Sequence, residues 1–223
     1  MSKKNKQVEV NEFDETIAAS KSFFEKYQKQ IVYGVGSILT IIIAALLINQ
    51  FYITPRNEKA NVALFPAEQL FRSGQYDKAL NGEGETLGFL AVADKYGCTK
   101  AGNIARLYAG ICYVETEKYQ EAIDILQDFD GCDDEMISPS SLGLLANCYA
   151  QLNQTEKALE FFLKAAKVAD NNLLSPIYLI QAGKLYESKG ENDKALDCYN
   201  QIKEKYQLSL QYGEIEKYIE HIK

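Results

Sequence analysis

The sequence contains a single histidine, His221, close to its last residue. Catalytic triads that use histidine and metal sites built from several histidines are therefore excluded. The glycines at Gly82 and Gly84 are not followed by a Lys-Ser or Lys-Thr pair, so they do not form a phosphate-binding loop. We expect no catalytic residues, no bound metal and no cofactor, and we place His221 on the surface.

Cysteine is too sparse and too irregular to organise the fold. The five cysteines are an odd number without CxxC spacing, which argues against a zinc site and against a complete disulfide framework. None precedes Cys98, which excludes a lipoprotein anchor. Cys112 and Cys148 occupy equivalent repeat positions and are expected to be buried. Cys98 and Cys132 are expected in loops at equivalent ends of neighbouring repeats. Stacked helices lie about 8–10 Å apart, so a disulfide there would need a bent loop, and the oxidation state of both thiols stays open.

The chain also lacks an excess of positive charge. Six of the 24 lysines and arginines and five of the 31 acidic residues precede Arg56, which leaves 18 against 26 and a net charge of -8 beyond it. A domain this acidic is a poor binder of nucleic acid. The acidic run from Asp128 to Glu135 lacks the alternation of a calcium-binding loop and is predicted to be an acidic loop between repeats.

One long apolar run is present, from Ile31 to Ile48. It holds 18 residues without a charge, which as a helix would span about 27 Å, just enough to cross a lipid bilayer. Phe51 and Tyr52 form an aromatic pair suited to the interface, and Pro55 is predicted to end the helix. The pattern predicts an uncleaved signal anchor; a buried core helix is the alternative.

The charges that flank this run predict its orientation. Lys21, Lys26 and Lys29 precede it, whereas only Arg56 and Lys59 follow closely, which favours a cytoplasmic N-terminus and a domain on the far side of the membrane. The leader also places apolar residues at helical spacing. It is expected to form either an amphipathic helix or a plain extension of the span; these residues are Phe13, Ile17, Phe24 and Tyr27.

Three later segments repeat one pattern at spacings of 36 and 37 residues. A small residue is followed by a tyrosine, a polar turn and an alanine near the start of a second helix. The small residue lets two helices approach, the tyrosine covers the junction, and the alanine fills the facing position. The three sets are Gly110, Tyr113 and Ala122; Ala146, Tyr149 and Ala158; and Gly183, Tyr186 and Ala195.

Less regular segments lie on both sides of these repeats. Residues 71–80, FRSGQYDKAL, form another turn and second helix, preceded by a helix over about 59–73. A break at Gly82-Glu83-Gly84 and a helix over 86–96 indicate a diverged repeat with an insertion. Residues 214–222 are predicted to form a capping helix, which such arrays need to cover their last apolar face.

The repeated residues resemble those of the tetratricopeptide repeat (TPR) family from about Ala60 to Lys223. We therefore predict an all-α fold, with a single N-terminal transmembrane helix followed by a TPR solenoid. The predicted segments are a cytoplasmic leader (1–30), a signal anchor (31–53), a diverged first repeat (56–100), three repeats (101–136, 137–173 and 174–210) and a capping helix (211–223).

The basic leader, single span and NGEGET insertion together resemble the YfgM-like family of bacterial inner-membrane proteins. That resemblance implies a periplasmic TPR domain in the inner membrane and an accessory role at the SecYEG export channel. It also implies a membrane-anchored, PpiD-like peptidyl-prolyl isomerase as companion, and periplasmic or secreted proteins as clients. Two other functions stay open: a structural adaptor linking envelope or division complexes, and a cytosol-facing receptor.

The repeat phase predicts a protein-binding groove along the concave side of the first helices. Its aliphatic members would receive an apolar helix or extended segment, unless they pack against the preceding helix. The surface is too apolar for the lysine- and arginine-rich clamp that captures chaperone C-termini. The predicted residues are Ile104, Leu107 and Ile111; Asn147 and Gln151; and Ile180, Lys184 and Glu187.

Overall fold

The computed structural model describes residues 26–132 and 134–222. It divides into two compact units at Pro55 and Arg56. The described residues are helical apart from loops and one two-stranded hairpin. The predicted leader helix, with Phe13, Ile17 and Phe24, lies almost wholly outside the described residues.

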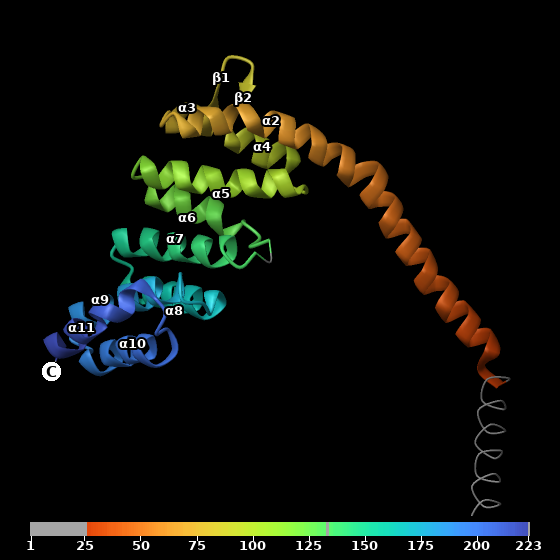
Figure 1. The fold of residues 1–223 in the computed structure, drawn as a ribbon. Helices are drawn as coiled ribbons and strands as arrows, with labels where there is room; N and C mark the ends of the chain where they lie inside the picture. Colours follow the sequence, from red (N-terminus) through yellow and green to blue (C-terminus); the bar gives the residue numbers. More distant parts are fainter. Residues whose placement is uncertain (1–25, 133, 223) are drawn as a thin grey trace, which may run out of the picture. The chain divides into compact units, whose positions relative to one another are not determined.

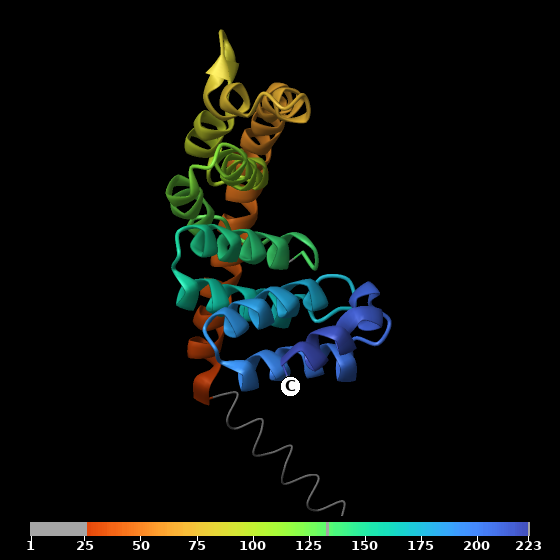
Figure 2. The same cartoon turned by 90° about the vertical axis from the view of Figure 1, so that its left-hand side faces the viewer.

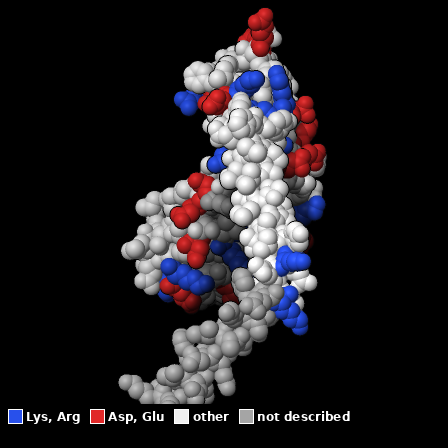
Figure 3. Space-filling model, turned by 90° about the vertical axis from the view of Figure 1, so that its right-hand side faces the viewer, with Lys and Arg blue, Asp and Glu red and all other residues white. Residues whose placement is uncertain are grey.

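The first unit is a helix that covers residues 26–48 and continues into a π-helical turn, η1 (Asn49–Ile53). Within the described residues, this helical segment is the one that is long and apolar enough to cross a membrane. None of its most apolar stretch is buried by other described parts of the protein. Figure 3 shows a continuous surface without charged atoms along this helix.

The expectation that Pro55 ends this helix is wrong, because α2 (Thr54–Arg72) follows η1 directly. In η1 the N–H of Thr54 donates to the carbonyl of Asn49, five residues back instead of four. Proline lacks an N–H, and inside an α-helix its ring meets the carbonyl four residues back. The π turn changes the hydrogen-bond register just before Pro55, which lets the helix continue through it.

The second unit is an array of antiparallel helix pairs (Figure 1). Each pair has a long first helix and a second helix, and the pairs stack one on the next (Figure 2). After α2 come α3 (Tyr76–Asn81) and α4 (Phe89–Tyr96), then α5 (Lys100–Glu115) with α6 (Tyr119–Gln127), α7 (Ile137–Gln151) with α8 (Thr155–Ala169), and α9 (Ser175–Ser188) with α10 (Asn192–Lys205). A 3-10 turn, η2 (Leu210–Glu214), leads into α11 (Ile215–Ile222).

A β-hairpin is inserted in the chain between α3 and α4, in the diverged first repeat. Strand β1 (Gly82–Glu83) pairs with β2 (Thr86–Leu87), with Gly82 opposite Leu87. The helix expected over 86–96 therefore begins only at Phe89. A Cβ on Gly88 would lie 2.3 Å from the backbone nitrogen of Gly82, so the chain returns almost to the point where it left. The hairpin thus projects from the array without separating the two helices that flank it (Figure 1).

The expected close approach at the small repeat residues is confirmed for both glycines. A Cβ on Gly110 would lie 2.5 Å from the side chain of Leu126 on α6. A Cβ on Gly183 would lie 2.4 Å from the ring of Tyr199 on α10. A larger residue would push the second helix away, so these positions fix the packing distance of each pair.

The array contains its own hydrophobic core. Two clusters of buried apolar side chains fill it, one around α2 to α5 and one from α6 to α11. Their first buried member is Ala60 and their last is Ile219, so both clusters lie inside the unit that begins at Arg56. Residues 56–223 therefore hold what a helical array needs in order to fold by itself.

Candidate protein-binding groove

The aliphatic groove residues are partly buried in the core and partly exposed to solvent. Ile104, Leu107 and Ile111 lie along α5 and are all half-buried. Ile104 packs against the N-terminal core cluster, whereas Leu107 packs against the C-terminal one. Ile180 on α9 also packs against the C-terminal cluster. These side chains thus support the array and keep part of their apolar surface available.

The polar groove residues are more open. Asn147 and Gln151, one turn apart on α7, are exposed. Lys184 on α9 is exposed as well, and its ammonium group lies 5.5 Å from the ring centre of Tyr218 on α11. A cation over an aromatic face is held in place at small cost in solvation. The capping helix thereby positions the one lysine that was predicted for the groove.

Glu187 differs from the other predicted groove residues, because its carboxylate is already engaged. The hydroxyl of Tyr199 on α10 donates a hydrogen bond to it. Burial raises the pKa of Tyr199 above its ordinary value, and the hydrogen bond to the Glu187 carboxylate raises it further. Glu187 therefore joins α9 to α10 and offers less to a ligand than Lys184 does.

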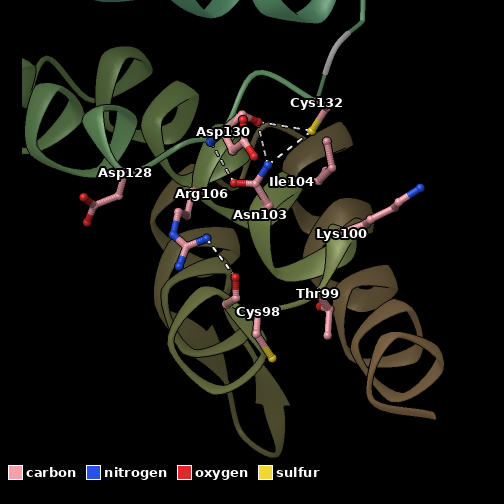
Figure 4. Close-up of a pocket in the computed structure, with 10 residues that line it drawn as sticks. Cys98, Thr99, Lys100, Asn103, Ile104, Arg106, Asp128, Asp130 and Cys132 are labelled. Atoms are coloured by element: carbon pink, nitrogen blue, oxygen red, sulfur yellow. Dashed lines mark hydrogen bonds between the residues drawn. The ribbon is translucent and has the colours of Figure 1, made fainter. Parts of the chain in front are cut away.

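A hollow of about 620 Å³ lies at one end of α5, beside Ile104 (Figure 4). Its walls come from the loop before α5, the first turns of α5 and the loop between α6 and α7. The Asn103 amide joins them: it donates to the Asp130 carbonyl at 2.7 Å and accepts from the Asp130 N–H at 3.0 Å. Arg106 donates to the Gly97 carbonyl at 3.1 Å. The loops are thus fixed by the helix that they border.

Cys98 and Cys132 both line this hollow and are exposed free thiols. In Figure 4 the Cys132 sulfur is directed toward the Asn103 side chain, whereas Cys98 lies well away from both. The Cys132 sulfur accepts a hydrogen bond from the Asn103 amide at 3.2 Å. The described residues contain no group of three or more side chains arranged to hold a metal ion. The described acidic residues Asp128, Asp130, Asp134 and Glu135 lie in the loop between α6 and α7.

The other three cysteines are buried, as the sequence predicted for Cys112 and Cys148. Burial raises the pKa of the Cys112 thiol to about 12 and the pKa of the Cys148 and Cys198 thiols to about 11. Because the thiolate is the reactive form, we expect these three to react with maleimide on the order of 100-fold more slowly than a free thiol at mildly alkaline pH.

Intact-mass measurement checks this expectation. The native protein should gain two adducts, on Cys98 and Cys132, and the protein unfolded in guanidinium should gain five. A Cys98→Ser/Cys132→Ser variant is the matched control and should gain none while folded. A third adduct that forms in the native protein as fast as the first two would contradict the burial of the remaining thiols.

Sequence reasoning missed a set of exposed apolar residues in the loops. Met136, Leu173, Leu208 and Leu210 are exposed, and none belongs to the buried clusters or to the apolar residues packed against them. Met136, Leu173 and Leu210 follow one another at intervals of 37 residues, which is the spacing between the second and third repeats. The repeat period could therefore have found them.

Comparison with known proteins identifies the repeats. Tetratricopeptide repeat profiles match residues 138–207 and residues 105–129. Human tetratricopeptide repeat protein 29 is 28% identical over 105 residues, which are 44% of this chain and 22% of that protein. The match thus spans about a fifth of the relative's length.

A solved structure shows the same fold. TPR-like repeats of a kinesin light chain from Podosopora anserina superpose with a TM-score of 0.55 at 13% identity, over 74% of this chain and 85% of that one. TPR proteins are generally scaffolds without enzymatic activity. These matches support the TPR repeat family, and the helix pairs of this chain form an all-α, TPR solenoid-like array that serves protein–protein interaction.

Proposed function

We propose that this chain is a membrane-anchored scaffold at the bacterial SecYEG export channel. Its apolar helix would cross the inner membrane with the N-terminus in the cytoplasm. Its TPR groove would recruit a PpiD-like isomerase, a periplasmic chaperone or an emerging secreted client. The resemblance to the YfgM-like family supports the assignment to the SecYEG channel, and the TPR repeats support protein binding in the groove.

The observation that carries the anchor is the exposure of the apolar helix. Most of its large side chains, among them Ile41, Leu46 and Ile48, are more than half exposed. Burial of such side chains contributes roughly 1.5–3 kcal/mol each, so leaving them all in water is unfavourable. A buried core helix, the alternative from the sequence, does not fit a stretch that no other described part of the protein covers. A lipid bilayer would cover all of it.

Thiol labelling in whole cells tests the orientation. Cys98 and Cys132 are exposed, so a membrane-impermeant maleimide that passes the outer membrane should label them in intact cells. Cys98→Ser/Cys132→Ser is the background control. With that variant as host, Ser2→Cys should be labelled only after the inner membrane is broken. Protection of Cys98 and Cys132 in intact cells would instead support the cytosol-facing receptor.

Site-specific photo-crosslinking tests the partners. A photoreactive amino acid at Lys184 or Leu107 should crosslink to SecYEG subunits, to the isomerase or to secreted clients. The same group at Glu160, an exposed position on the second helix α8, is the matched control. Recovery of envelope or division proteins from Lys184 would favour the structural adaptor, and absence of export components in detergent purifications would reject the channel assignment.

A further inference from the structure

Three large apolar side chains occupy one repeat position at the loop edge of the array. Met136, Leu173 and Leu210 follow one another at 37-residue intervals, at or just before the first turns of α7, α9 and η2. They are 44%, 56% and 90% exposed, and Leu208 beside the last is 89% exposed. We call these four residues the loop ladder. Because they contribute nothing to the buried clusters, stability of the array does not explain them.

Two of the ladder residues are held by the same turn. The Asp134 carboxylate accepts from the N–H groups of Met136 and Ile137, both at 2.8 Å. Asn171, 37 residues later, accepts from Leu173 at 3.0 Å and from Leu174 at 2.8 Å. The backbone therefore has the same turn before α7 and before α9, and in both turns the apolar side chain is exposed.

Hydrogen bonds between loops bring the later ladder residues to one edge. The Tyr206 hydroxyl donates to the Asp170 carboxylate at 3.1 Å. The N–H of Leu208 donates to the side chain of Asn172 at 3.3 Å, next to Leu173. The loops before α9 and η2 are therefore neighbours, and the starts of α7 and α9 lie on the same side of the array (Figure 2).

The ladder is continuous with the groove along α9. Ile177 lies one turn after Leu173 and is partly exposed, and the groove residue Ile180 follows three residues later. Ile177 and Ile180 are three residues apart on α9 and share one face of that helix, and Leu173 lies in the turn two residues before it. A ligand in the groove can therefore extend over the loop edge without leaving an apolar surface.

The charges around the ladder differ from one end to the other. Near Met136 the described residues of the loop between α6 and α7 expose the carboxylates of Asp128, Asp130, Asp134 and Glu135. Near Leu208 the Asp170 carboxylate accepts a hydrogen bond from Tyr206. Lys167 and Lys205 occupy the last turns of α8 and α10, and the exposed Glu204 lies beside Lys205. The ladder is therefore strongly acidic at one end and mainly apolar at the other.

We propose that the loop ladder binds a partner-protein segment in which basic residues adjoin apolar ones. The basic residues would lie against the acidic loop near Met136, and the apolar residues would cover Leu173, Leu208 and Leu210. Exposed apolar patches mark interaction sites, and opposite charges select the partner and fix its register. An anionic lipid surface fits less well, because four carboxylates would face it. This proposal rests on the protein-binding scaffold proposed above and names the chemistry of its ligand.

Residues 56–223, which contain the complete core, are suited to the test. The probe is a fluorescent helical peptide with a lysine-rich half and a leucine-rich half, and its twin carries glutamate in place of lysine. We expect the lysine peptide to bind more tightly than its twin. Leu208→Ser/Leu210→Ser should weaken its binding about tenfold. The matched control Val62→Ser/Phe65→Ser, which changes two exposed residues of α2, should leave binding unchanged.

The charge requirement is tested separately. Asp128→Asn/Glu135→Gln leaves the turn made by Asp134 intact. It should lower the affinity of the lysine peptide several-fold at low salt and change it little at high salt. Equal affinity for the two peptides, or unchanged affinity in Leu208→Ser/Leu210→Ser, would overturn the proposal. Recovery of the fragment with anionic lipid vesicles through Leu208 and Leu210 would also overturn it, in favour of a lipid surface.

The outcome for the ladder is separable from the outcome for the scaffold. In one case, a Lys184 crosslink to export components persists in Leu208→Ser/Leu210→Ser, but the same substitution leaves the affinity of the lysine peptide unchanged. The scaffold proposal then stands and the ladder proposal fails. If the lysine peptide requires the ladder but Lys184 yields no export components, the ladder stands and the channel assignment fails.

Discussion

Replacing Phe89 by alanine is expected to destabilise the N-terminal helix pairs by about 3–5 kcal/mol. Phe89 is fully buried at the first position of α4. Its ring stacks on Tyr108 of α5, with 5.0 Å between ring centres, and meets the edge of Phe71 at 6.2 Å. Alanine removes the contacts that hold α4 against α2 and α5 after the hairpin, and leaves a cavity that stiff neighbouring rings cannot close.

Circular dichroism and hydrogen exchange measure this effect. At about 2–4 °C per kcal/mol, the melting temperature should fall by roughly 10 °C. Each repeat contacts only its neighbours, so amide exchange should accelerate more in α2 to α5 than in α9 and α10. Phe65→Ala is the matched control, since Phe65 on α2 is 59% exposed and its loss should cost less than about 0.5 kcal/mol. Equal melting of the two variants would show that the Phe89 cluster does not support the array.

The repeat pattern predicted the pairs that are regular and failed where local chemistry overrides the period. Gly110 and Gly183 could be read from sequence because a small residue at a fixed spacing has one main use, the close approach of two helices. Pro55 could not. Proline normally ends a helix, and nothing in a hydropathy pattern predicts the π turn that lets α2 continue.

The hairpin in the first repeat shows a second limit. Thr86 and Leu87 fit a helical pattern with the residues after them, yet they pair with Glu83 and Gly82. The turn lies at Gly84 and Glu85, where Gly84 has a φ of 62°, and the close return at Gly88 makes the hairpin compact. Such backbone geometry depends on contacts between segments, which periodicity does not contain.

The groove was placed by repeat phase, but phase alone does not say which side chains are free. Glu187 occupies a groove position and is nevertheless engaged by Tyr199, while Lys184, three residues earlier, is held open over Tyr218. Both outcomes depend on side chains of other helices, namely α10, the second helix of the same repeat, and α11, the capping helix. The loop ladder differs, because its 37-residue spacing can be seen in the sequence, whereas the exposure of its side chains is known only from the structure.

The capping helix gives the second large expected effect. Ile215 and Ile219 on α11 are almost fully buried against the C-terminal cluster. Replacing one such isoleucine by alanine costs about 2–5 kcal/mol, and two neighbours on one helix do not add simply. Ile215→Ala/Ile219→Ala should therefore detach α11 and expose the apolar face of α9 and α10. Tyr218 would then no longer hold Lys184.

Hydrogen exchange and crosslinking separate the two consequences of losing the cap. Amides of α9 and α10 should exchange faster in Ile215→Ala/Ile219→Ala, and crosslinks from a photoreactive group at position 184 should decrease in the same variant. Val62→Ala/Phe65→Ala is the matched control, because both side chains are exposed on α2 and their loss should change stability by less than about 0.5 kcal/mol. If the cap variant loses stability but keeps its crosslinks, α11 only seals the array. If both are lost together, the cap also shapes the end of the groove that meets the ligand.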